Sequence, residues 1–426
     1  MMLAKARAIL LRGQGHGVHL LELRQSTEAP EPKASARAIT INFITGCLGS
    51  AILSLPWSVA GSSMVTSVLI VAVALLINAW TLSIVVRAAE RYNVFDLGAI
   101  LAHLPYGIGP PLQAMTNIFV WISMFLCLVS YVIVIRDSAR TLVIGTWLDD
   151  HFLLGALASI CVLPLCFLSQ RMLERTSSIA IAVNVYLLAL IGVLYGRGVS
   201  SETLPEGCCI FGVTSRGVFA MITVMFQAVS LQMCVLPMYK DLEGRSPQKF
   251  DSIVAAGFGV LFFLFSGFSC VGYLLIGQDV KSNILEDLPM GLASSIAHMG
   301  TILTVACVYP IMVYPMTAPL QDRTGTLFGL NRNSVVAIAK WLIVTAAMVT
   351  ALCVRSLGIV NVINGAMSAT VFVALIPSII GLGLMDFGRC HKAVLVMLLI
   401  VGTTVFCMGF VFSDNFVAEL QCSIEA

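Results

Sequence analysis

The stretch GCLGSAILSLPWSVAG, Gly46–Gly61, combines two opposed properties. It lies in a run apolar enough to cross a bilayer, yet it contains three glycines and a proline, which weaken helices in water. At membrane depth, non-helical backbone persists only where it lines a cavity or is buried in protein. The stretch therefore predicts a discontinuous helix whose freed amide and carbonyl groups bind a small zwitterion or an ion. Close helix packing is the alternative, because Gly46 and Ser50 have the four-residue spacing of small interface residues.

The composition of the whole chain indicates a membrane protein. Of its 426 residues, 58% are hydrophobic and 11% are charged, whereas about a quarter of the residues in soluble domains are charged. Long apolar runs recur along the chain, so we expect it to cross the bilayer many times. A net charge of +2 gives no indication of nucleic-acid binding.

Eleven apolar segments approach the roughly 20 residues that a membrane helix needs. We expect helices at 38–60, 65–86, 112–135, 152–168, 178–196, 217–239, 252–276, 295–320, 334–354, 358–382 and 393–412. The chain then divides into a polar, disordered tail (1–37), a ten-helix core (38–382), and an eleventh helix with a short final tail (383–426).

Lysine and arginine predict the orientation, because cytoplasmic segments carry an excess of both. With the N-terminus in the cytoplasm, 18 of the 24 Lys and Arg residues fall in cytoplasmic segments and six fall in outer segments. The odd helix count then places the final tail outside the cell or in a lumen. Cys208, Cys209 and Cys422 lie in outer segments of this arrangement, where a disulfide could form.

The sixth segment shares the unusual features of the first. Its stretch MFQAVSLQMCVLPMYKDL, Met225–Leu242, carries Gln227, Ser230 and Gln232 at mid-depth and its own Leu-Pro pair. The first and sixth helices begin two sets of five helices each. Because five is an odd number, the second set crosses the membrane in the opposite direction to the first. Interrupted helices at equivalent positions of inverted repeats indicate the central site of a transporter. The predicted fold is therefore an all-α polytopic membrane protein with a 5+5 inverted repeat, discontinuous helices 1 and 6, and one extra C-terminal helix.

Five motifs in this order resemble the amino acid/auxin permease family, and its sodium-coupled neutral amino acid transporter branch in particular. Gly49–Leu53 is similar to the GSGIL signature of that family, and Val235–Leu242 is similar to its VLPxYxEL stretch. The other three resemble its third-helix SYxxxIxD pattern, its paired prolines of helix eight and its helix-ten GAxSA: Ser130–Asp137, Tyr309-Pro310 with Tyr314-Pro315, and Gly365–Ala369. The resemblance covers about residues 38–412.

The resemblance implies alternating-access transport of an amino acid. The carboxylate and amino group of the substrate would meet the backbone of Gly46–Ile52 and the middle of helix six. The substrate-binding residues so implied are Thr45, Gly46, Gly49, Ser50, Ala51, Ile52, Phe226, Gln227, Ser230 and Gln232. Neither helix one nor the middle of helix six carries a carboxylate, which favours neutral substrates, because a cationic one needs a counter-charge.

The chain departs from the family pattern at two places. Ala51 replaces the second glycine of GSGIL and adds a Cβ that narrows the site. Gln232–Cys234 replaces the His-Pro-Glu of many relatives, which removes a titratable pair and a helix breaker. Asn361 and Asn364 in helix ten are expected to form interhelix hydrogen bonds.

No cofactor is expected, but sodium and protons are candidate co-transported ions. Thr45 matches the helix-one oxygen donor of sodium-coupled relatives and would contribute to a weak sodium site. Ala306 and Val308 stand at the helix-eight positions and offer no side-chain oxygen. Asp137 and His298 are candidate proton carriers, although their places near helix ends favour interfacial roles.

Catalysis has little support, because HExxH, GxSxG and Walker motifs are absent from the sequence. We therefore expect no enzyme and no dedicated metal centre. The partners expected are an amino acid and the lipid bilayer. A sensor that binds an amino acid at the same site with little transport is the alternative function. The plasma membrane and an endolysosomal or vacuolar membrane both fit the sequence.

Overall fold

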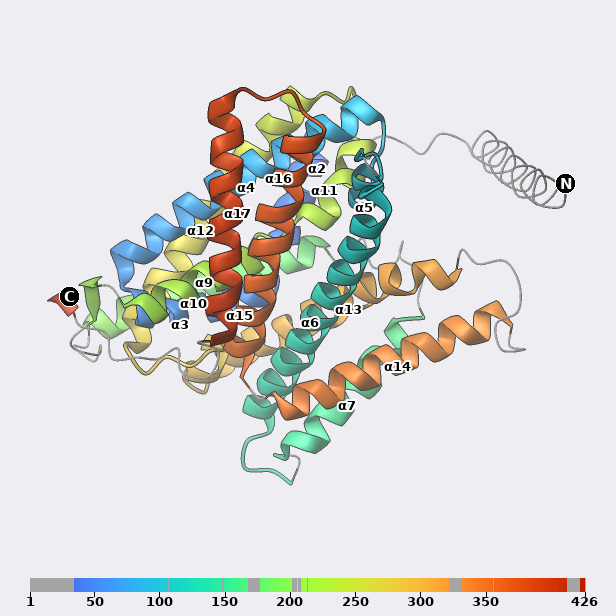
Figure 1. The fold of residues 1–426 in the computed structure, drawn as a ribbon. Coiled ribbons are helices and arrows are strands. Elements are labelled where there is room, and N and C mark those ends of the chain that lie inside the picture. The colour runs from blue at the N-terminus through green and yellow to red at the C-terminus, as the bar shows by residue number, and fades with distance from the viewer. Residues whose placement is uncertain are drawn as a thin grey trace, which may run out of the picture.

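The computed structural model describes residues 34–105, 107–147, 149–167, 177–200, 205, 208–212, 214–321, 331–354, 356–411 and 422–425. These residues are predominantly helical (Figure 1). The elements of the first half are α2 (Ala36–Cys47), η1 (Ser50–Ser54), α3 (Leu55–Ser62), α4 (Met64–Tyr92), α5 (Leu97–Leu101), α6 (Gly109–Val143), α7 (His151–Leu165), α9 (Ser177–Ser200) and β1 (Cys209–Gly212). Those of the second half are α10 (Ser215–Ala228), α11 (Gln232–Asp241), α12 (Pro247–Ile276), η2 (Ile284–Asp287), α13 (Leu292–Gln321), α14 (Arg332–Cys353), α15 (Leu357–Ser368), η3 (Ala369–Leu375), α16 (Ile376–Gly383), α17 (Arg389–Val411) and β2 (Cys422–Glu425).

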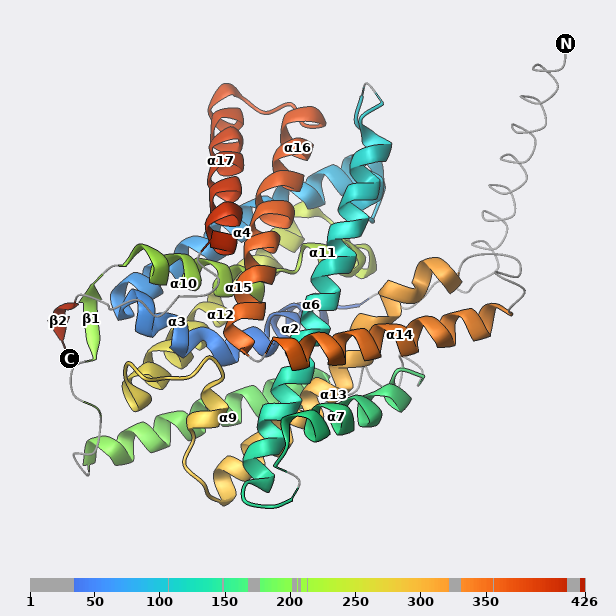
Figure 2. The same ribbon diagram turned by 60° about the horizontal axis from the view of Figure 1, so that its bottom comes forward.

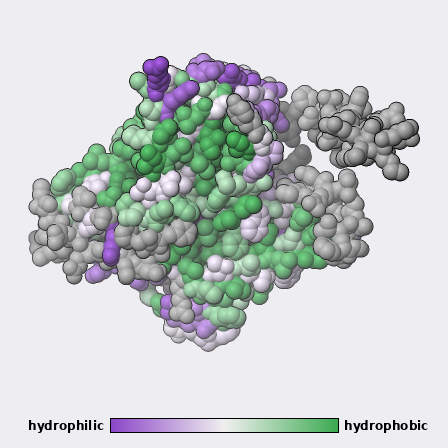
Figure 3. Space-filling view, viewed as in Figure 1, coloured by the Kyte–Doolittle hydropathy of each residue, from purple (hydrophilic) through white to green (hydrophobic). Residues whose placement is uncertain are grey.

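The helices have the length and composition of membrane spans. Among the described residues, nine helices are long and apolar enough to cross a bilayer, and the bent pair α2 with η1–α3 makes a tenth if it counts as one span. The apolar helix α7 is shorter, with 15 residues. Figure 3 shows hydrophobic residues over the middle of one face and hydrophilic residues gathered at its top and bottom. This distribution is the one that a bilayer requires of an integral, multi-pass protein.

The first predicted segment is interrupted, as expected, at Leu48 and Gly49. The two halves are bent by 45°, and the short 3-10 helix η1 lies between α2 and α3. Pro56 does not cause the break, because it lies in the first turn of α3, where an amide donor is not needed. The glycine-containing break precedes the proline by several residues.

The sixth segment is also interrupted, which confirms that prediction. Helix α10 ends at Ala228, and α11 begins at Gln232. A Cβ added at Gly46 would stand 2.8 Å from Leu231 Cδ2, so the two breaks lie against each other. Helix α10 also approaches α3 so closely that a Cβ at Gly217 would stand 1.5 Å from the backbone oxygen of Gly61. Only glycine permits this approach.

Polar side chains of α15 tie the neighbouring helices together around the breaks, as predicted for Asn361 and Asn364. Asn361 Nδ2 donates to Ser54 Oγ at 2.9 Å, and Asn361 Oδ1 accepts from Ser130 Oγ of α6 at 3.1 Å. Asn364 Oδ1 accepts from Ser123 Oγ of α6 at 2.9 Å. These bonds satisfy buried amides and fix α15 between α6 and η1.

The predicted start of the first helix is wrong by two residues. Helix α2 begins at Ala36, inside the predicted tail 1–37, because the Ser35 hydroxyl accepts a hydrogen bond from Ala38 N at 3.3 Å and caps the helix. The tail before Ala34 lies outside the described residues.

The predicted end of the third helix is also wrong. The sequence predicts an end at residue 135, but α6 runs to Val143. Arg136 and Asp137 form an ion pair of 2.8 Å, so neither charge stops the helix from continuing inside the bundle.

Non-helical contacts close the two ends of the bundle. At one end, Ala34 N donates to Asp241 O at 2.8 Å, so the start of α2 lies beside the end of α11. At the other end, β2 pairs antiparallel with β1 (Figure 2). The pairing brings Cys208, Cys209 and Cys422 into neighbouring segments, and a disulfide among them stays a prediction.

Candidate functional site

A cavity of about 440 Å³ lies where the two interrupted segments meet. Eight of the ten residues predicted to bind substrate line it: Thr45, Gly46, Gly49, Ser50, Ala51, Ile52, Gln227 and Ser230. The remaining walls come from α6, α9 and α13. The structure therefore brings the break of the first segment and the break of the sixth to one cavity.

The cavity wall is neutral and mostly apolar. No charged side chain is among its lining residues in the described part of the chain. Ser123, Cys127 and Tyr131 face it from α6, at the four-residue spacing of one helix face. Thr301 and Thr304 line it from α13. Such a wall suits a ligand whose own charges sum to zero.

Three polar atoms of the cavity wall are buried without a hydrogen-bond partner. They are Gln227 Oε1, Ser230 Oγ and Thr304 Oγ1. Gln227 is held in place through its other amide atom, because Gln227 Nε2 donates to Cys127 Sγ at 3.4 Å. A buried polar atom left unpaired costs about 1–3 kcal/mol. These atoms are therefore the natural partners of a bound polar ligand.

The backbone of the first break adds a second polar feature. Gly49 precedes η1 in an extended conformation (φ −94°, ψ −164°), and no side chain caps the amides that begin η1. Amide groups at a helix start attract negative charge. Ser50 and Ala51, at this start, both line the cavity. One wall thus offers amide donors, and the facing break offers the acceptors Gln227 and Ser230.

Two of the predicted site residues do not line the cavity. Gln232 is fully buried, and its Nε2 donates to Asn78 Oδ1 of α4 at 2.6 Å. Phe226 is packed in the core with 8% of its surface exposed. Both lie beside the break in sequence, but their side chains are directed into helix packing.

Of the residues considered for a sodium site, Thr45 and Val308 line the cavity and Ala306 does not. The hydroxyl of Thr45 donates to Ile41 O at 2.8 Å. The side-chain oxygens that α13 presents are those of Thr301 and Thr304, and of these two only Thr304 Oγ1 is buried without a partner. Thr304 lies one helical turn before Val308 in the sequence, and this spacing could have identified it as a residue of the cavity wall.

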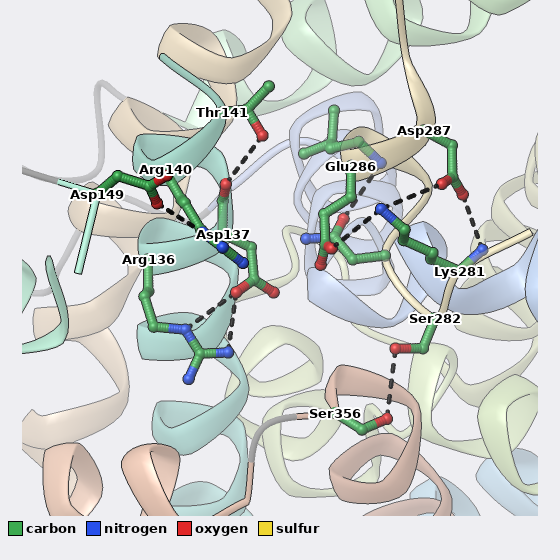
Figure 4. Close-up of polar contacts among 12 residues, drawn as sticks. Arg136, Asp137, Arg140, Thr141, Asp149, Lys281, Ser282, Glu286, Asp287 and Ser356 are labelled. Atoms are coloured by element: carbon green, nitrogen blue, oxygen red, sulfur yellow. Dashed lines mark hydrogen bonds and ion pairs between the residues drawn. The ribbon is translucent and has the colours of Figure 1, made fainter. Parts of the chain in front are cut away.

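The two candidate proton carriers lie outside the cavity. Asp137 pairs with Arg136 (Figure 4), and both side chains are buried in the bundle, which differs from the interfacial role expected for Asp137. His298 is buried, and neither ring nitrogen has a hydrogen-bond partner.

Solved structures with a similar fold are secondary transporters. A Na⁺-coupled sialic acid symporter, in a substrate-bound outward-open state, matches with a TM-score of 0.52 and 10% identity over 92% of both chains. A nucleobase–cation symport family transporter, closed around bromovinylhydantoin, matches with a TM-score of 0.59 and 10% identity over 92% of this chain and 94% of its own. These matches show that the overall fold of the chain is similar to that of solved secondary transporters.

The sequence comparisons identify the family. The family model described as transmembrane amino acid transporter protein matches residues 32–416, and the chain belongs to this family. The provisionally named sodium-coupled neutral amino acid transporter 11 of Mus musculus is 23% identical over 395 residues, which is 89% of this chain and 85% of that relative. Amino acid transporter AVT6E of Arabidopsis thaliana is 24% identical over 313 residues, 67% of this chain and 62% of its own. The resemblance inferred from the five motifs is confirmed, and the chain is a transporter and not an enzyme.

Proposed function

We propose that the protein carries a neutral amino acid across a membrane by alternating access, and that the cavity between the two breaks binds the substrate. The observation that supports this most directly is the set of unpartnered buried acceptors facing uncapped amides. An amino acid zwitterion carries an ammonium donor and a carboxylate acceptor on one carbon. Its ammonium group would donate to the acceptors of one wall while its carboxylate accepts from the amides of the other.

The substrate's two charged groups have different partners in this proposal. The ammonium group donates to Gln227 Oε1 and Ser230 Oγ, which have no other donor. The carboxylate accepts from the amides at Ser50 and Ala51, at the start of η1. The side chain of the substrate then lies against the apolar remainder of the wall. A lysine or arginine substrate would bury a charge without a counter-charge, which is strongly unfavourable.

The architecture and orientation that we propose follow the sequence predictions. The core, 38–382, consists of two inverted sets of five helices, with α7 as the short fourth member, and 383–426 adds an eleventh helix. The N-terminus is cytoplasmic. Two contacts support the division of the segments between the two sides: Ala34 lies beside the α11–α12 connection, and β2 lies beside β1. Each contact joins two segments that the distribution of Lys and Arg places on the same side.

Sodium is the co-transported ion that the relatives' names suggest. A sodium ion must exchange its hydration shell for about five or six oxygens. Thr45 and Thr304 supply two side-chain oxygens on the cavity wall. The others would come from carbonyl groups freed at Leu48 and Gly49, where α2 ends.

Uptake by the purified protein in proteoliposomes tests the proposal. Radiolabelled neutral, acidic and basic amino acids are offered under a sodium gradient and, separately, under a pH gradient. We expect saturable accumulation of a neutral amino acid that unlabelled neutral amino acids inhibit. Saturable binding without accumulation would instead identify an amino acid sensor with the same site. Absence of both binding and uptake across the panel would contradict the proposal.

A further inference from the structure

The thiol of Cys127 lies on the cavity wall between two side-chain amides. Cys127 belongs to α6, lines the cavity and is half-buried. Its Sγ accepts a hydrogen bond from Gln227 Nε2 of α10 and another from Asn364 Nδ2 of α15, each at 3.4 Å. Helix α15 contributes no lining residue to the cavity in the described part of the chain. The thiol therefore connects Gln227, on the cavity wall, to a residue behind that wall.

The amide of Asn364 has a defined orientation. Ser123 Oγ donates to Asn364 Oδ1 at 2.9 Å, and Asn364 Nδ2 donates to Ser123 O at 3.2 Å. The two bonds have opposite polarity, so the amide oxygen and nitrogen cannot exchange places without losing both bonds. Asn364 is fully buried, so water does not replace them. Asn364 Nδ2 is therefore a fixed donor that faces the sulfur of Cys127.

Close packing of α10 against α15 places Gln227 beside this thiol. A Cβ added at Gly365, the residue after Asn364, would stand 1.8 Å from the backbone oxygen of Thr223, and only glycine permits this approach. Thr223 lies one helical turn before Gln227, so both residues lie on the same face of α10. Backbone contact between the two helices thus determines where Gln227 lies.

The contact with sulfur then determines which amide atom of Gln227 faces the cavity. The last torsion of a glutamine side chain is broad and roughly two-fold, so the amide can turn over in place. With Nε2 bonded to Cys127 Sγ, Gln227 Oε1 is left without a partner on the cavity wall. The turned amide would present Nε2 instead, a donor that cannot accept from an ammonium group. A weak acceptor is enough for this selection, because it only has to favour one of two orientations.

We propose that Cys127 is a positioning residue for the substrate: its sulfur, backed by Asn364, holds the Gln227 amide with Oε1 available to the substrate ammonium. This inference rests on the proposed function, because the orientation of Gln227 matters only if an ammonium group binds there. No covalent bond forms or breaks at the sulfur. The ability of residue 127 to accept a hydrogen bond, and not its size, therefore sets the affinity.

Equilibrium binding of a radiolabelled neutral amino acid to the purified, full-length protein tests the inference. Cys127→Ala and Cys127→Val both remove the acceptor but differ in volume, and each should raise the Kd about 3- to 10-fold, the value of one hydrogen bond. Cys127→Ser keeps an acceptor, and its hydroxyl proton can bond to the carbonyl one turn back, so the Kd should stay within about twofold. Cys270→Ala, at a half-buried cysteine of α12 outside the cavity, is the control and should not change the Kd.

A double variant separates positioning from general packing. Gln227→Leu has no amide to orient, so adding Cys127→Ala to it should leave its Kd unchanged. Two residues that act independently would instead multiply their effects on the Kd, because their free energies add. The comparison of Cys127→Ala in the two backgrounds therefore measures whether Cys127 acts through Gln227.

Three results would overturn the inference: an unchanged Kd in Cys127→Ala and Cys127→Val, an equal increase in Cys127→Ser, or independent effects in the double variant. Thermal unfolding of the same samples is the second measurement. A midpoint lowered alike in all three Cys127 variants would assign the residue to packing and would also overturn the inference. A wild type that binds a neutral amino acid with the same Kd as these variants loses only the positioning role. A wild type that binds no amino acid contradicts the proposed function itself.

Discussion

Replacing Gln227 by leucine separates substrate binding from folding. Gln227 Oε1 is buried on the cavity wall without a partner, and Nε2 makes only a weak contact of 3.4 Å with Cys127 Sγ. If a substrate ammonium donates to Oε1, the lost bond is worth about 1.5–3 kcal/mol, which raises the substrate Kd about 10- to 150-fold. The same change removes an unsatisfied oxygen from the interior. Thermal stability should therefore stay the same or increase.

Gln232→Leu is the matched control, with the same chemistry a few residues away. Its side chain lies outside the cavity, so the Kd should stay within about twofold, which corresponds to less than about 0.5 kcal/mol. It does hold Asn78 through a bond of 2.6 Å, and Asn78 Nδ2 already lacks a partner. Leaving Asn78 Oδ1 unpaired as well costs about 1–3 kcal/mol. The change also removes the unpaired Gln232 Oε1, so the net loss of stability should lie at the lower end of that range.

Equilibrium binding of a radiolabelled neutral amino acid to the detergent-purified variants measures the Kd, and thermal unfolding of the same samples measures stability. The two variants should show opposite patterns: weaker binding in Gln227→Leu and lower stability in Gln232→Leu. An unchanged Kd in Gln227→Leu, or an equal loss of binding in both, would refute our placement of the substrate ammonium.

Two further predictions concern packing and buried charge. Gly217→Ala should destabilise the protein by more than about 3 kcal/mol, because the added Cβ would stand 1.5 Å from the backbone oxygen of Gly61. Gly267→Ala is the control: its added Cβ has nothing within 4 Å, so the thermal midpoint should stay the same or rise. An equal loss of stability in both variants would contradict the packing argument. Arg136→Leu should lower stability by about 3–5 kcal/mol, since it strands Asp137 as a buried charge. Adding Asp137→Asn should restore much of that loss, and a double variant as unstable as the single one would show that the ion pair is not the cause.

Much of the fold could be predicted because the bilayer makes the problem local. Each span must satisfy its own backbone, so a run of about 20 apolar residues is already a helix whatever packs against it. Glycine and polar residues inside such a run mark a break for the same local reason, and both breaks lie where Gly46–Gly61 and Met225–Leu242 place them. Of the two helix ends predicted wrongly, the end of α6 depends on the buried Arg136–Asp137 pair, whereas the start of α2 depends on the local Ser35 cap.

The direction of each side chain was decided only by tertiary packing. Gln227 and Gln232 look alike in the sequence, yet one faces the cavity and the other bonds to Asn78, because the rotation of each half-helix is set by its neighbours. Thr304 lines the cavity and Ala306 does not, although the family pattern placed the helix-eight oxygen donor at the positions of Ala306 and Val308. Contacts of this kind depend on how independently formed helices assemble, which no local stretch of sequence determines.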